Sequence, residues 1–183
     1  MTIASIEEVD QFWFVDHDEE DWFFNKTATF DQEIRERFFD TWDAGQQGLL
    51  HPWRETFKGR MMEIIVLDQF SRNLWRGDAR SYSQDGMTMI LSQHLIKMPE
   101  FKKLSHKEQH LMLLPLVHQE SKGIHQEILP IYQAMNNWEY EKREVKHKKI
   151  IDRFGRYPHR NEILGRLSTP EEIAYLKENG PLG

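Results

Sequence analysis

Apolar residues recur along most of the chain at the three- and four-residue spacing of an α-helix. This spacing places the apolar side chains on one face of each helix, while the residues between them are mostly charged. The predicted helical segments are Ile6 to Trp13, Phe30 to Trp42, Phe57 to about Ser71, Met87 to Leu95, Leu111 to Val117, Ile124 to Met135 and Trp138 to Phe154. The pattern therefore predicts a chain built almost entirely from amphipathic helices.

Residues typical of helix ends lie between these segments. Capping boxes begin at Thr29, Ser105 and Thr169, and the last is followed by a proline at the first helical position. Asn136 or Asn137 is a further N-cap candidate, and Gly45 and Gly155 are expected to end helices. Pro115 is expected to kink or end its helix because proline lacks the backbone N–H. Trp22, Phe23 and Phe24 are expected to form an aromatic plug.

The fold class follows from this pattern and from the absence of alternating apolar and polar runs. No strand-like alternation or Asn-Gly hairpin occurs. We therefore predict an all-α protein of seven to nine helices in a single domain, residues 1–183. Helix pairs of roughly 35 to 40 residues joined by short loops suggest a tetratricopeptide-like array of antiparallel pairs. The consensus pattern of that repeat is missing from the sequence.

Composition restricts the class of protein. The chain has 183 residues, 39% of them apolar and 30% charged, and it contains no cysteine. Disulfides and thiolate chemistry are therefore excluded, and we expect a soluble, cytoplasmic protein that does not enter a membrane. The net charge of −6 argues against nucleic acid as a partner. We make no prediction of the oligomeric state.

A first polar cluster follows the segment that ends near Ser71. Asp68 and Arg72 are four residues apart, so they share a helix face and can form an ion pair, while Arg76 lies in the loop beyond. Two interpretations remain open. The pair ties a helix end to its neighbour, or Arg72 or Arg76 binds an anion.

Two further polar clusters lie in the second half of the chain. His118 and Glu120 directly follow an apolar run, which is typical of a residue at the edge of the core. The other cluster is a loop shaped by glycine and proline that carries Arg153, Arg156, His159, Arg160 and Asn161. Such a loop either binds an anion or ties the fold together through ion pairs. A lone histidine is more often structural than catalytic.

Several kinds of chemistry are not supported. His106 and His110 are four residues apart but lack the zinc-peptidase order, so we predict no metal site. No phosphate-binding glycine loop, nucleophile elbow or dinucleotide fingerprint occurs, and we expect no cofactor. The lysines and arginine between residues 142 and 149 are interpreted as a solvated helix face rather than an RNA-binding surface.

The same polar strings resemble an uncharacterised, mainly bacterial family, the domain of unknown function 924. The resemblance covers nearly the whole chain and rests on Phe12-Trp13-Phe14, residues 67–73, residues 115–120 and residues 147–166. It implies a tetratricopeptide-like helical fold and no known activity. The chain departs from the family pattern at Ser71, where proline is usual, and at Gln119, where serine is usual. A serine nucleophile at the second position would be absent here.

These observations lead to one leading hypothesis and two alternatives. The leading hypothesis is a binding module in which the three polar clusters line a common hollow for a small anionic ligand or an acidic peptide. The enzyme alternative is a hydrolase or lyase that uses His118 or His159 as general acid or base while the arginines stabilise developing negative charge, and Glu120 is a further catalytic candidate. The third interpretation is a protein-interaction scaffold in which the polar clusters are purely structural.

Overall fold

A computed structural model describes residues 2–24 and 28–180, and all of its regular structure there is helical. Nine α-helices and several short π- and 3-10 segments are present in these ranges, and no strand is. The prediction of an all-α fold is therefore confirmed. In this part of the chain no helix combines the length with the apolar character needed to cross a bilayer. The chain forms two compact units, residues 1–100 and 101–183, so the prediction of a single domain stays a prediction.

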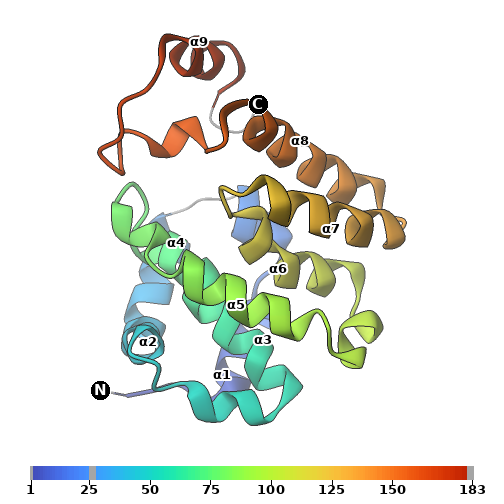
Figure 1. The fold of residues 1–183 in the computed structure, drawn as a ribbon. Helices are drawn as coiled ribbons and strands as arrows, with labels where there is room; N and C mark the ends of the chain where they lie inside the picture. The colour runs from blue at the N-terminus through green and yellow to red at the C-terminus, as the bar shows by residue number, and fades with distance from the viewer. Residues whose placement is uncertain (1, 25–27, 181–183) are drawn as a thin grey trace. The chain divides into compact units, whose positions relative to one another are not determined.

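The first unit contains α1 to α5 (Figure 1). The helices are α1 (Ile6–Asp10), α2 (Ala28–Gln46), α3 (Phe57–Ile65), α4 (Ser71–Leu74) and α5 (Asp85–Leu95). A π-helical segment, Gln11–Asp16, continues α1, and another, Val66–Phe70, joins α3 to α4. In the second case, every residue of the segment is buried.

Aromatic rings fill the core of this unit. Phe12 and Trp13 are fully buried, and the ring of Phe12 lies 4.9 Å from that of Phe38 and 6.1 Å from that of Phe70. Trp22 stacks on Trp13 at 5.0 Å, as expected for an aromatic plug. The side chains of residues 23 and 24 lie outside the described part. Each ring buried in this way stabilises the fold by roughly 1.5 to 3 kcal/mol.

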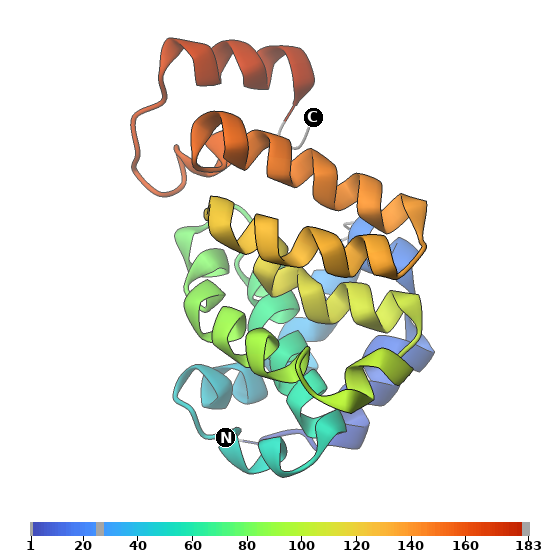
Figure 2. The same ribbon diagram turned by 45° about the vertical axis from the view of Figure 1, so that its right-hand side comes forward.

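The second unit contains α6 to α9. The helices are α6 (His106–Val117), α7 (Lys122–Ala134), α8 (Trp138–Phe154) and α9 (Pro170–Asn179). Figures 1 and 2 show α7 and α8 side by side, which fits the short turn, residues 135–137, that joins them. A short loop between helices makes them antiparallel neighbours. A 3-10 turn, Pro158–Arg160, lies between α8 and α9.

Most predicted helix ends are confirmed. The capping boxes of Ser105 and Thr169 are both complete, and the Asn137 side chain accepts hydrogen bonds from the N–H groups of Glu139 and Tyr140. Gly155 ends α8 with a φ of 71°, in the left-handed region that favours glycine. The Ser5 capping box that begins α1 was not predicted.

Two predicted boundaries are wrong. Thr29 does not cap α2, because the helix already includes Ala28. Gly45 does not end α2 but lies buried inside it, where an added Cβ would meet the side chains of Leu67 and Leu50 at 3.0 and 3.1 Å. Its lack of a side chain therefore serves helix packing rather than chain reversal. Pro115, which was expected to kink or end its helix, lies inside α6, and the helix ends two residues later at Val117.

Candidate functional site

The first predicted cluster lies in the first unit, where α4 follows the buried π-helical segment. Arg72 makes an ion pair with Asp68 at 3.0 Å, as predicted, and a second one with Asp85 at 2.8 Å. Burial acts to lower the pKa of Arg72, but the two carboxylates outweigh it and raise the pKa. The guanidinium therefore stays charged and joins α4 to the start of α5.

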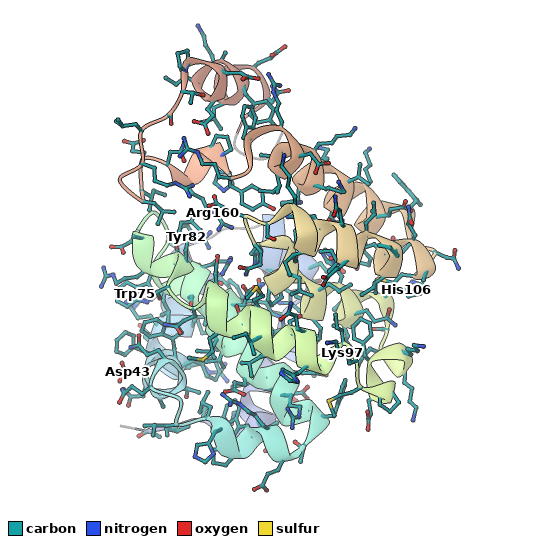
Figure 3. The ribbon with its side chains drawn as sticks, in the orientation of Figure 1. Asp43, Trp75, Tyr82, Lys97, His106 and Arg160 are labelled. Carbon is teal, nitrogen blue, oxygen red and sulfur yellow. The ribbon has the colours of Figure 1, made fainter. Side chains whose placement is uncertain are left out.

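Arg76 and Arg80 follow in the same region, and each is held by its own carboxylate. Arg76 donates two hydrogen bonds to Asp31 on α2, at 2.7 and 2.8 Å. Arg80 binds Asp78 and lies over the ring of Trp75, labelled in Figure 3, at 3.6 Å. These bidentate and stacked contacts satisfy the planar fork of each guanidinium. The contacts of Arg76 therefore match the interpretation in which the cluster joins one helix to its neighbour through ion pairs.

The second and third predicted clusters are brought together in the second unit by Glu120. Its carboxylate accepts hydrogen bonds from Arg166 at 2.5 and 2.9 Å and from the backbone N–H of Tyr157 at 2.7 Å. Burial acts to raise the pKa of Glu120, but these donors outweigh it and lower the pKa. The loop after α6 is thus joined to the loop after α8, about forty residues later in the chain.

Tyr157 is the centre of this joined region. Its side chain is 1% exposed, and its hydroxyl donates a hydrogen bond to the carbonyl of Val117. The guanidinium of Arg160 lies over its ring at 4.7 Å, and the ring centroid of His159 lies 5.6 Å away. Arg160, labelled in Figure 3, is 6% exposed, whereas His159 is only partly buried. Three predicted residues, His159, Arg160 and Glu120, therefore surround a tyrosine that the sequence had not singled out.

A buried histidine–carboxylate pair, His125 and Glu144, contacts Tyr157 through the histidine, and the sequence did not predict it. His125 and Glu144 are both at most 1% exposed, and His125 Nδ1 lies 2.7 Å from Glu144 Oε1. His125 Nε2 lies 3.1 Å from the Gln119 carbonyl oxygen and 3.2 Å from the Tyr157 hydroxyl. A carbonyl oxygen can only accept a hydrogen bond, so Nε2 of His125 carries a hydrogen. A second proton, on either His125 Nδ1 or the Glu144 carboxyl group, forms the hydrogen bond between these two groups. Burial raises the pKa of Glu144, although the hydrogen bond from His125 acts against it.

The remaining predicted residues of the third cluster are tied to α9. Arg156 binds Glu172 through two hydrogen bonds, at 2.7 and 2.9 Å, and Asn161 donates to the same carboxylate at 3.2 Å. These donors, with Arg156 first, lower the pKa of Glu172 to about 2. Arg153 pairs with Glu171 at 2.8 Å, where both side chains are more than half exposed. Arg153 and Arg156 are therefore each occupied by a carboxylate of the chain itself.

His118 is the C-cap residue of α6, and its side chain is partly buried. It lowers the pKa of the partly buried His147, after the larger effect of desolvation, so the two imidazoles lie near each other. His147 lies 5.9 Å from the ring of Tyr157. His118 thus belongs to the same histidine- and tyrosine-rich part of the second unit as His159.

Two of the three predicted clusters therefore meet within one unit, and the first cluster belongs to the other unit. The prediction that all three line a common hollow stays a prediction. Among the residues described by the structure, no group of three His, Asp or Glu side chains is arranged to hold a metal ion. A hollow of about 680 Å³ lies in the first unit, between the N-terminal segment and α2, and none of the predicted site residues lines it.

Comparison with known proteins finds a family and a solved structure that are similar to this chain. The model of a family described as a bacterial protein of unknown function (DUF924) matches residues 9–180. A solved structure of a protein of unknown function from Agrobacterium tumefaciens is 32% identical to the chain, with a TM-score of 0.88. The match covers 95% of this chain and 97% of that one. No curated protein matches the chain.

Proposed function

The chain belongs to the family described as a bacterial protein of unknown function, and we propose that it is a helical binding module for a small anionic ligand or an acidic peptide terminus. The binding groups are His118, His159 and Arg160 in the second unit. Glu120 and Asn161 hold the loops that carry these binding groups. Both accept hydrogen bonds from Arg166, whose Nε donates to Asn161 Oδ1 at 3.0 Å. One observation carries the proposal. The Glu120 carboxylate ties the loop of His118 to the loop of His159 and Arg160.

The electrostatic character of this region supports an anionic ligand. Arg160 is charged at all accessible pH values, and its guanidinium lies over an aromatic face rather than in open solvent. The side chains of His118 and His159 are partly exposed, so a ligand can reach both imidazoles from solvent. A carboxylate or phosphate is the partner that a guanidinium binds most strongly.

The contacts narrow the set of residues to which binding is assigned. Arg72, Arg76, Arg153 and Arg156 each face carboxylates of the chain itself, and a ligand would have to displace one of them. We assign these four arginines and Asp68 to the frame rather than to the ligand. This part of the proposal coincides with the structural-network interpretation of the polar clusters.

Ligand titration tests the proposal. Inorganic phosphate, succinate and a short peptide with a free acidic C-terminus are titrated while the melting temperature is measured. A ligand at 100 times its Kd stabilises the folded state by about 2.7 kcal/mol, which raises the melting temperature by several degrees. The rise should disappear in the double variant His118→Ala/His159→Ala and in Arg160→Gln. It should persist in the control Arg153→Gln, which changes an exposed arginine in the last turn of α8, just before that loop.

Each outcome decides between the alternatives. If none of the three probes shifts the melting temperature, or if the double variant responds like the unchanged protein, the binding proposal is wrong. If hydrolysis or elimination is observed and disappears in His118→Ala while the fold is kept, the acid–base enzyme is the correct alternative. The circular dichroism spectrum of each variant shows whether its helices remain intact.

A further inference from the structure

The outer face of α8 carries a row of exposed side chains that the proposed function does not use. Trp138, Lys142, Lys146 and Lys149 are all exposed and follow one another at spacings of four, four and three residues. These spacings place them on one face of the helix. Tyr140, Glu144, Ile150 and Ile151, which face the core, are buried. We call the four exposed residues the α8 stripe.

The tryptophan is the unusual member of the stripe. Trp138 is 67% exposed at the first position of α8, and Lys142 Nζ lies 5.6 Å from its ring centroid. Tryptophan is enriched at the energetic centres of protein interfaces because it supplies a large apolar area, and charged side chains beside it steer an oppositely charged partner. The stripe therefore has the composition of a docking surface.

Other charged residues of α8 lie near the stripe. Beside the stripe, Lys148 makes an ion pair with Asp152 at 2.5 Å, and Arg153 makes one with Glu171 at 2.8 Å. From Trp138 to Lys149 the helix rises about 17 Å, or about three turns. The carboxylates of Glu139, Glu141 and Asp152 flank the row on the same helix.

We propose that the α8 stripe binds an acidic helical segment of a partner protein, which places its carboxylates on Lys142, Lys146 and Lys149 and an apolar side chain on Trp138. A three-turn helix has the length of the stripe and carries carboxylates at the same three- and four-residue spacings. A bilayer or an RNA strand would spread its phosphates beyond the row of lysines and over the flanking carboxylates of Glu139, Glu141 and Asp152. A narrow acidic helix covers the lysines and avoids those repulsions.

The test uses a synthetic probe and the full chain. The probe is a fluorescent three-turn peptide that carries glutamates at three- and four-residue spacings and one leucine in its first turn. Anisotropy should report binding that weakens as salt is added. Lys142→Glu/Lys149→Glu and Trp138→Ala should each weaken it about tenfold or more. The control Lys102→Glu/Lys103→Glu makes the same charge change on two exposed lysines of the same unit, and it should leave binding within about twofold of the unchanged protein.

Several results would overturn the proposal. They are an absence of peptide binding at low salt, equal losses in the stripe and control variants, or unchanged binding in Trp138→Ala. If phosphatidylglycerol vesicles or a 20-nucleotide RNA bind more tightly than the peptide, the partner of the stripe is a membrane or an RNA and not an acidic helix. The four side chains are exposed, so helical content and melting temperature should not change. The variants His118→Ala/His159→Ala should bind the peptide normally, which separates this proposal from the one above.

Discussion

The two units of this protein are held together by different kinds of core. The first unit buries a cluster of aromatic rings, among them Phe12, Trp13, Phe38 and Phe70, which contact one another directly. The second also has an apolar core, largely of aliphatic side chains, but it buries His110, His125 and Glu144 within it, together with Tyr132 and Tyr157. His110 Nδ1 lies 2.9 Å from the hydroxyl of Tyr132, and the ring of His110 stacks on Tyr140 at 4.3 Å.

This difference shows which physical term each unit depends on. An aromatic core is stabilised by removing apolar surface from water, and that term does not change with pH. A polar core is stabilised only while each buried group keeps its partner and its protonation state, because an unpaired polar group in the interior is costly. Both units bury carboxylates, Glu63 and Asp68 in the first and Glu144 and Glu172 in the second, but among the described residues only the second buries histidines. The second unit should therefore be the one that responds to mild acid.

The largest effect is expected for a truncation in the aromatic core. Phe12→Ala should lower the free energy of unfolding by about 3 to 5 kcal/mol, because it removes a fully buried ring and leaves a cavity. Urea denaturation followed by tryptophan fluorescence measures the change, since five of the six tryptophans lie before residue 100. The control Val15→Ala, at a side chain that is 66% exposed, should change little. A loss below about 1 kcal/mol for Phe12→Ala would show that these rings are not the dominant core.

The second effect is a loss of stability on acidification that is confined to the second unit. Burial, with smaller effects of Arg143 and the neighbouring His147 and His118, lowers the pKa of His110 to about 3. In the unfolded chain a histidine takes up its proton near pH 6.5, so between these values the unfolded state binds more protons and stability falls as the pH falls. Between pH 6.5 and 4 this single group should cost about 3 kcal/mol, at about 1.4 kcal/mol per pH unit.

Hydrogen exchange at several pH values measures this effect unit by unit. Amides of α6 to α8 should lose protection between pH 6.5 and 4, while those of α2 and α3 should keep it. His110→Gln cannot take up this proton, so its stability should fall less steeply with acid than that of the unchanged protein. If both units lose protection together, or if the slope is the same in the variant, the protonation of His110 is not the cause.

The smallest effect is expected for the buried pair of His125 and Glu144. Glu144→Ala leaves His125 Nδ1 without its partner in the interior and should cost about 1 to 3 kcal/mol. Glu144→Gln keeps the size of the side chain and an oxygen or amide at the same place, and should cost less. Thermal unfolding at pH 7 compares the two. A Gln variant that is as destabilised as the Ala variant would mean that the carboxylate itself, not the hydrogen bond, is required.

Local sequence signals were sufficient for the helices and for several of their ends. The three- and four-residue spacing, the capping boxes of Ser105 and Thr169 and the glycine at 155 involve residues within one or two turns of each other, and these interactions form wherever the chain goes. The pair of Asp68 and Arg72 is of the same local kind. Gly45 was misassigned because a glycine inside a helix and one at its end look alike in sequence, and only the approach of Leu50 and Leu67 distinguishes them.

By itself, the sequence determined that this chain is helical, where most of its helices lie and which polar strings are unusual. Only the tertiary structure decided which partner each polar side chain has: Glu120 with Arg166, Glu172 with Arg156, and His125 with Glu144. These partners are 16 to 46 residues apart. The sequence does not show which of these groups pair, because any arginine can pair with any carboxylate. The pairing is decided by the packing of α6 to α9, which brings one particular donor and one particular acceptor within hydrogen-bond distance.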